Sequence, residues 1–223
     1  FNSYGYNKNY NTNITESVLT NDFLYSSNQF INTKGIISSY ELLLKNNNSY
    51  SKNSSTFKEN GKYDVFGTLK FDSSLPMAKI NSDYTNYLTP RISFRYSPNN
   101  NSDISSKNIL LNYNNVFSLN RIGANHEVEG GESLSLGLEF KRDNINGLNN
   151  FDLKFANNFR FNENKQLPTK SKLNKTRSDI FGNLNYKINN DFKIANNLRF
   201  NENKLLPAKS KLNKTRSDIF GNF

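Results

Sequence analysis

Apolar and polar residues alternate along much of the chain with a period of two. Between Leu134 and Phe140 every second residue is apolar, and the residues between them are Ser135, Gly137 and Glu139. This period places the apolar side chains on one face of an extended strand, whereas a helix would spread them around its surface. The same alternation recurs in several other segments, so we predict an all-β fold.

The alternating segments predict about ten strands in an antiparallel up-and-down meander. Short Asn-rich turns separate some strands, and longer connections containing Pro168 or Pro207 separate others. The predicted strands cover residues 21–31, 35–45, 63–72, 88–97, 109–118, 132–142, 151–162, 178–188, 192–202 and 217–223. The spaced tyrosines Tyr4, Tyr6 and Tyr10 leave open a further strand at the start of the chain.

Alternation alone leaves two architectures open, a soluble β-sandwich and a membrane β-barrel. The predicted strands are longer than the roughly 5–6 residues typical of soluble proteins and closer to the roughly 9–11 residues that cross an outer membrane. Charged residues fall on the face opposite the apolar ones, which suits a lipid-facing exterior and a wet lumen. We therefore predict that residues 1–223 form a single domain, a partial outer-membrane barrel.

Composition excludes several classes of protein. Only 35% of the 223 residues are hydrophobic, but aromatic residues make up 13%, which argues against a disordered chain. No apolar run approaches the roughly 20 residues of a membrane-spanning helix. With no Cys and one His, ligands for metals are almost absent. We predict no catalytic residue, no metal and no cofactor, and do not expect an enzyme.

Positive charge is concentrated in the second half of the chain. Residues 1–111 carry 11 basic and 8 acidic side chains, and residues 112–223 carry 18 and 11, which gives +3 and +7. The densest basic segment contains Lys165, Lys170, Lys172, Lys175 and Arg177. It is interpreted either as a solvated loop or as a loop that meets anionic lipid head groups. Base-stacking aromatic residues are not interleaved with it, so nucleic acid is not an expected partner.

An internal duplication is visible near the end of the chain. Residues 156–184 recur as residues 195–223, with 25 of 29 positions identical. Two copies are too few for a solenoid, so we interpret them as a duplicated hairpin or as an artefact of sequence assembly. The chain also begins without Met or a signal peptide, which predicts that it is a segment of a longer protein.

Three neighbouring segments carry a more specific pattern. Residues 87–98 read YLTPRISFRYSP, residues 116–123 read VFSLNRIG, and residues 128–140 read VEGGESLSLGLEF. In order and spacing they resemble the LptD family of outer-membrane lipopolysaccharide-assembly proteins, in which an L-x-P-R strand precedes an N-R-x-G element, an acidic loop and a strand ending in G-L-x-aromatic. The positions that match this pattern, for which we predict structural roles, are Pro90, Asn120, Arg121, Gly123, Gly130 and Gly131.

The resemblance implies a part in lipopolysaccharide transport in the outer membrane of a Gram-negative cell. A large barrel of this family would receive lipopolysaccharide from a periplasmic bridge, pass the sugar head through its lumen and release the acyl chains sideways into the outer leaflet. A small lipoprotein plug would sit inside the barrel. The expected partners are therefore lipopolysaccharide, outer-membrane lipid, the plug and the bridge.

Such transport needs a charged, hydrated lumen rather than catalytic groups. Basic side chains on the inner face could donate charge-assisted hydrogen bonds to phosphate. The candidates are Arg91, Arg95, Lys141, Lys154, Arg160, Lys187, Lys193 and Arg199. The alternative is that they neutralise carboxylates such as Asp72, Glu139 and Asp152 on neighbouring strands.

Two other functions remain open from the sequence. A passive porin or ligand-uptake barrel would have a constricting loop folded inward and would conduct solutes as an isolated chain. A surface β protein would use its repeated basic hairpins to bind polyanions. His126, next to Glu127 and near Glu129, is interpreted as part of a surface turn rather than a metal or acid–base site. Arg121 is predicted to anchor a loop, with a lumen role as the alternative.

Overall fold

Strands are the only regular elements in the described part of the chain. The computed structural model describes residues 1–9, 13–55, 59–98, 103–123, 127–144, 149–187, 193–201 and 216–220. The strands are β1 (Asn2–Asn9), β2 (Thr15–Ser26), β3 (Phe30–Ile31), β4 (Ile37–Lys52), β5 (Asn60–Ser74), β6 (Met77–Ile80), β7 (Tyr84–Ser97), β8 (Gly131–Asn144), β9 (Asn149–Arg160), β10 (Ile180–Lys187), β11 (Lys193–Asn201) and β12 (Arg216–Phe220). Among these residues no helix is long and apolar enough to cross a membrane.

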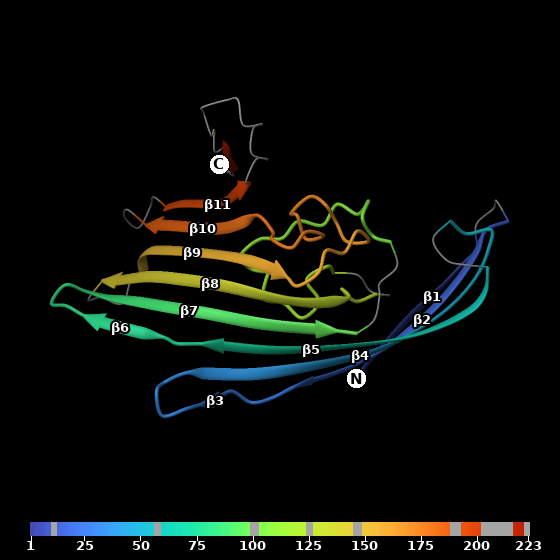
Figure 1. The fold of residues 1–223 in the computed structure, drawn as a ribbon, viewed down its shortest axis with the longest axis horizontal. Coiled ribbons are helices and arrows are strands. Elements are labelled where there is room, and N and C mark those ends of the chain that lie inside the picture. The colour runs from blue at the N-terminus through green and yellow to red at the C-terminus, as the bar shows by residue number, and fades with distance from the viewer. Residues whose placement is uncertain are drawn as a thin grey trace.

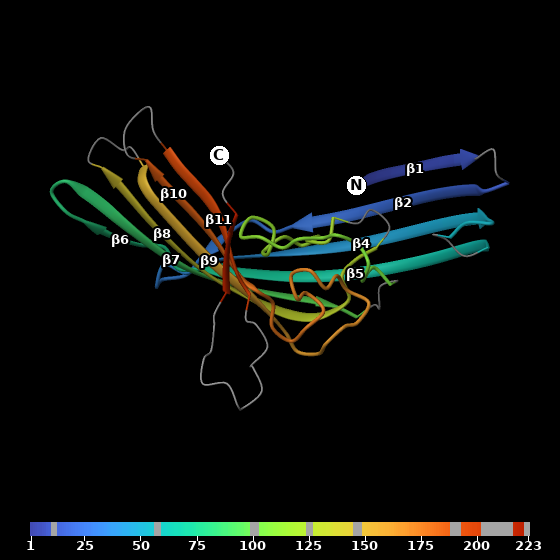
Figure 2. The same cartoon turned by 90° about the horizontal axis from the view of Figure 1, so that it is seen from above.

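All of these strands belong to one antiparallel sheet. Its order is β1-β2-β4-β5-β7-β8-β9-β10-β11-β12, and the short strands β3 and β6 pair with β4 and β7. Each main strand therefore pairs with its neighbours along the chain, and the sheet curves without closing (Figures 1 and 2). The prediction of an all-β meander that forms part of a barrel is confirmed.

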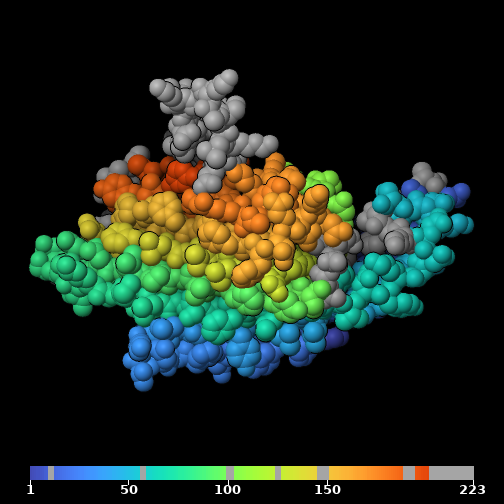
Figure 3. Space-filling view, in the orientation of Figure 1, coloured from blue at the N-terminus to red at the C-terminus, as the bar shows by residue number. Residues whose placement is uncertain are grey.

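The two faces of the curved sheet differ in polarity. Large apolar side chains such as Ile92, Leu136 and Leu138 lie on the convex face and are 41–43% exposed. No second layer covers the strands on the face seen in Figure 3, where β4, β5, β7, β8 and β9 follow one another across the surface. Within the described residues there is one sheet, so the stacked β-sandwich is excluded there.

Two long connections fold back into the hollow of the sheet (Figure 2). They run from β7 to β8 and from β9 to β10. Their apolar side chains pack against Ala156 and Phe181 on the concave face and form a small core. The loop members of this core are Ile104, Leu111, Tyr113, Val116, Phe117, Ile122, Leu167 and Leu173. We call the described parts of these connections, residues 103–123 with 127–130 and residues 161–179, the first and second inner loops.

The predicted strand at residues 109–118 is wrong, because this segment lies in the first inner loop. Its apolar residues alternate as in a strand, but the asparagines between them turn the backbone. The Asn112 side-chain oxygen accepts hydrogen bonds from the backbone N–H groups of Asn114 and Asn115, at 2.9 and 3.1 Å. Asn side chains commonly replace strand hydrogen bonds in this way.

The other predicted strands are present, with boundaries that shift by several residues. The strand predicted at 21–31 begins at Thr15 and is interrupted after Ser26. Of the early tyrosines, Tyr4 and Tyr6 lie in β1, whereas Tyr10 lies outside the described residues. The first repeat copy contributes the end of β9, the second inner loop and the start of β10, and the second copy contributes most of β11 and all of β12. Much of the second copy lies outside the described residues.

Candidate functional site

A buried cluster of charged residues connects the first inner loop to the sheet. Glu129 is 1% exposed, and Arg95, Arg121 and Arg160 are 3–4% exposed. The Arg121 guanidinium donates from Nε and Nη2 to the two Glu129 carboxylate oxygens, each at 2.6 Å. Arg160 donates to Glu129 and, at 2.5 Å, to the Gly130 carbonyl. Glu129 is therefore shared by two arginines from different segments.

Arg121 also contacts the two strands beneath the loop. It donates to Ser133 Oγ of β8 at 2.8 Å and to Asn158 Oδ1 of β9 at 2.7 Å. Arg95 of β7 donates from Nε to the Leu119 carbonyl at 3.0 Å, and its Nη1 lies 3.8 Å from Glu129. The cluster thus connects the loop to three adjacent strands.

The arginines set the protonation state of Glu129. Burial alone would raise the pKa of this carboxyl, but the positive charges of Arg121, Arg95 and Arg160 outweigh it and lower the pKa to about 2. Three arginines and one glutamate leave a formal charge of +2 in the cluster. We infer that Glu129 is ionised at neutral pH and holds the three cations together.

The contribution of Glu129 to the free energy of unfolding should decrease at low pH. Its pKa falls from the ordinary 4.5 to about 2 on folding. The stabilisation is therefore complete above about pH 4.5 and is lost as the pH falls through about 2. In urea unfolding of the intact protein in detergent micelles, the stability difference between wild type and Glu129→Gln should shrink over that interval. A difference that stays constant to pH 2 would contradict this assignment.

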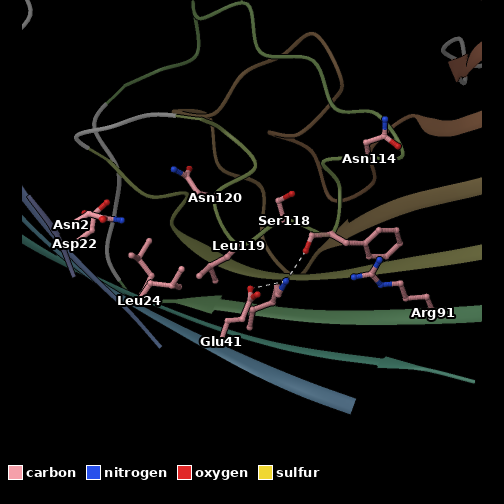
Figure 4. A pocket seen from close by; sticks show the side chains of 12 residues that line it. Asn2, Asp22, Leu24, Glu41, Arg91, Asn114, Ser118, Leu119 and Asn120 are labelled. Atoms are coloured by element: carbon pink, nitrogen blue, oxygen red, sulfur yellow. Dashed lines mark hydrogen bonds and ion pairs between the residues drawn. The ribbon is translucent and has the colours of Figure 1, made fainter. Parts of the chain in front are cut away.

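A cavity of about 540 Å³ lies between the first inner loop and the concave face of β2, β4, β5 and β7 (Figure 4). Strand residues Asp22, Glu41, Lys70 and Arg91 line one side. Loop residues around Phe117, among them Asn114, Ser118 and Asn120, line the other. Both charge signs and several amides therefore face one space.

The cations of this cavity already have partners. Lys70 Nζ lies 2.8 Å from Glu41 and 2.7 Å from Asp72, and it donates to the Phe117 carbonyl at 2.9 Å. The Arg91 guanidinium lies 3.6 Å from Asp72 and 4.3 Å from the centre of the Phe117 ring. An incoming phosphate would have to compete with these carboxylates.

The other predicted lumen cations fall into three groups. Arg95 and Arg160 are buried in the cluster around Glu129. Lys141, Lys154 and Arg199 lie near carboxylates, at 2.7 Å from Asp143, 3.4 Å from Asp152 and 3.6 Å from Asp179 respectively. Lys187 is half-buried on β10, and Lys193 begins β11 with its side chain outside the described part. Contact of any of them with lipopolysaccharide stays a prediction.

Tyr113 extends the polar network of the first inner loop toward β8. Its hydroxyl donates a short hydrogen bond to Glu139, and Lys154 Nζ lies 5.7 Å from its ring centre. Burial, followed by the hydrogen bond to Glu139 and the charge of that carboxylate, raises the pKa of Tyr113 above its ordinary value. The hydroxyl therefore remains a hydrogen-bond donor.

The basic segment lies in the second inner loop and presents most of its cations outward. Lys165, Lys170, Lys175 and Arg177 are exposed, while Leu167 and Leu173 between them are buried. Lys175 lies 3.1 Å from Glu163, and Lys172 lies 3.6 Å from the buried Asp179. Burial raises the pKa of Asp179, and the charges of Lys172 and Arg199 oppose that shift. The loop is thus anchored by its leucines.

The surroundings of four family-motif positions can be described, and their structural roles stay predictions. Gly131 has φ +90°, and a Cβ atom there would lie 2.6 Å from Arg160 Nη2, so a larger residue would disturb the cluster. Gly123 also has a positive φ of 61°. The Pro90 carbonyl accepts a hydrogen bond from the Leu75 N–H at 3.1 Å, and Asn120 lines the cavity.

Sequence reasoning missed Glu129, Ser133 and Asn158 as members of the cluster. The sequence placed Glu129 in the motif segment 128–140 and near His126, which lies outside the described residues, but did not predict it as a partner of the arginines. The available signal was the closeness of Arg121 and Glu129 in sequence, since they are eight residues apart. No group of His, Cys, Asp or Glu in the described part could hold a metal ion.

Comparison with known proteins gives one finding. The family model described as LptD, LPS transport system D, matches residues 7–215. That range covers both inner loops, the buried cluster and every cavity residue except Asn2. No curated protein matches the chain.

Proposed function

The chain belongs to the LptD family of outer-membrane lipopolysaccharide transport proteins, and on that premise we propose that it forms part of the barrel through which lipopolysaccharide reaches the outer leaflet. In this proposal residues 1–223 act as one domain. The convex face contacts membrane lipid, and the concave face borders the path of the sugar head group. The family match over residues 7–215 is the observation that carries the proposal.

The dimensions of the convex face support its contact with lipid. On β8 the residues facing outward between Glu132 and Arg142 are Leu134, Leu136, Leu138 and Phe140. At about 3.3 Å per residue and a strand tilt near 40°, this interval spans roughly 25 Å along the membrane normal. The apolar band of outer-membrane barrels has about this height.

The concave face supports passage of a hydrated, phosphorylated group. The cavity beside the first inner loop offers Asn114, Asn120, Lys70 and Arg91 to one space. Amides suit sugar hydroxyls, and guanidinium and ammonium groups suit phosphates. In the proposal a lipoprotein plug and a periplasmic bridge contact further parts of the barrel, and no step requires catalysis.

Photo-crosslinking in cells that make lipopolysaccharide tests the proposal. A photoreactive amino acid at Asn114, in the cavity, should capture lipopolysaccharide during transport. The same residue at Leu138, on the convex face, should capture mainly phospholipid. Equal capture of lipopolysaccharide at both positions, or capture at neither, would count against a sugar path along the concave face.

A passive porin is the second candidate, because the inner loops lie where a constricting loop would lie (Figure 2). A porin would conduct small ions and sugars when reconstituted alone in liposomes. A lipopolysaccharide transporter would instead depend on its periplasmic bridge. Solute flux from the isolated chain, without lipopolysaccharide capture at Asn114, would favour the porin.

A further inference from the structure

A row of three residues crosses three strands at one margin of the apolar band on the convex face. We call it the basic row, and it consists of Lys79, Asn86 and Arg142. Lys79 of β6 pairs with Asn86 of β7, and Asn86 pairs with Arg142 of β8. Directly opposed residues in a sheet project to the same face. Arg142 follows Phe140 on that face by two residues, so the row lies immediately beyond the apolar residues of β8.

The Arg142 side chain is held in one orientation. Its guanidinium carbon lies 4.3 Å from the centre of the Tyr84 ring, and its Nε donates to Asn86 Oδ1 at 2.8 Å. The register with β9 shifts between Arg142 and Asp143. Tyr84 and Asn86 therefore fix the guanidinium and leave its two terminal nitrogens free to donate.

No carboxylate of the described residues neutralises this row. Neighbouring Asp143 is paired with Lys141, whose Nζ lies 2.7 Å away, and both project to the concave face. Lys79 is exposed and has no ion-pair partner in the described part. This contrasts with Lys70, Arg91 and Lys154 of the concave face, each of which has a carboxylate within 4 Å. Unpaired cations next to an apolar band are suited to an anionic head group.

Aromatic side chains mark the same margin. Phe140 and Phe151 lie 5.9 Å apart between ring centres, and Phe151 and Tyr186 lie 6.2 Å apart. Phe151 is the direct partner of Arg142 across β8 and β9. Aromatic girdles lie at the two interfaces between membrane and water. The row is therefore placed at head-group depth.

Connection lengths identify the leaflet. The margin lies at the end where β8 and β9 are joined by residues 145–148 and β10 and β11 by residues 188–192. The inner-loop connections, residues 98–130 and 161–179, leave the opposite end. Outer-membrane barrels have short turns on the periplasmic side and long loops outside. The row therefore faces the periplasmic leaflet.

We propose that Arg142, which is oriented by Tyr84 and Asn86, and the exposed Lys79 together bind the phosphate of a phospholipid in the periplasmic leaflet. This inference rests on the proposed function only in placing the convex face in lipid. The fixed guanidinium edge would donate two parallel hydrogen bonds to phosphate oxygens, and the exposed lysine would add a second charge.

The test uses the intact protein in neutral detergent, titrated with dioleoylphosphatidylglycerol and followed by native mass spectrometry. Arg142→Gln and Lys79→Gln should each weaken binding roughly fivefold, since each removes one cation worth about a factor of five at a lipid surface. Arg142→Lys should lose part of the affinity for the phospholipid, because lysine keeps the positive charge but lacks the planar guanidinium that donates two hydrogen bonds. Lys107→Gln, in the first inner loop, is the control and should bind as wild type does.

Other outcomes would overturn the proposal. Equal binding by wild type and the Arg142/Lys79 double variant would show that the row is not the site. The proposal would also be overturned if the double variant lost lipid A binding while its phosphatidylglycerol binding stayed unchanged. If the convex face does not contact lipid at all, wild type itself will retain no phospholipid, which separates failure of the proposed function from failure of this site. Unchanged heat-modifiable migration in gels confirms that the variants fold.

Discussion

Glu129→Gln is expected to lower the free energy of unfolding by about 3–5 kcal/mol, the usual cost of removing one partner from a buried ion pair. Without the carboxylate, Arg95, Arg121 and Arg160 would remain buried next to one another with no compensating charge. The first inner loop should then detach from the sheet. Urea unfolding of the intact protein in detergent micelles measures the energy, and faster trypsin cleavage within the loop reports its release.

Glu132→Gln provides the matched control for this substitution. Glu132 lies three residues further along, and its side chain is exposed. Removal of its charge should change stability by no more than about 0.5 kcal/mol, as for most surface positions. Equal destabilisation by the two variants would mean that general loss of negative charge, and not the buried cluster, anchors the loop.

Leu136→Arg is expected to destabilise the protein in lipid vesicles by about 2–4 kcal/mol, the cost of an arginine near the midplane of a barrel exterior. Leu136 occupies the centre of the outward-facing apolar run of β8 and is 41% exposed. On a surface facing water, the same substitution would cost little, because the arginine would be hydrated. Unfolding free energies in vesicles therefore report directly on what surrounds the convex face.

Leu110→Arg is the control, because Leu110 has nearly the same exposure, 45%, but lies in the first inner loop. There the arginine is hydrated, so the substitution should change the free energy of unfolding by no more than about 0.5 kcal/mol. If both variants behave alike, lipid does not cover the convex face. The comparison needs no assumption about transport.

Sequence periodicity was sufficient to predict most of the strands and the face to which their side chains project. On β8, Leu136 and Leu138 were predicted on one face and Ser135 on the other, and they lie there. Periodicity succeeded because a two-residue repeat is a direct consequence of strand geometry. It failed at residues 109–118, where a similar alternation occurs in a loop whose turns depend on Asn112.

The environment of the inner-face cations could not be predicted in the same way. Arg95 and Arg160 were expected to face a wet lumen, but they lie beneath a loop and contact or approach Glu129. Their burial depends on a connection of 33 residues folding back, and no local pattern encodes that path. Leu167 and Leu173 were the available signal, since apolar residues within a basic connection require something to pack against.

The pairing of positive charges around the cavity has a consequence for any anion that moves along it. Lys70 and Arg91 are already neutralised by Glu41 and Asp72. A travelling phosphate that displaced these carboxylates would exchange one set of ionic contacts for another of similar strength, and so would not be trapped. Such a surface favours rapid transfer of the phosphate from one cation to the next, with little retention at any single position.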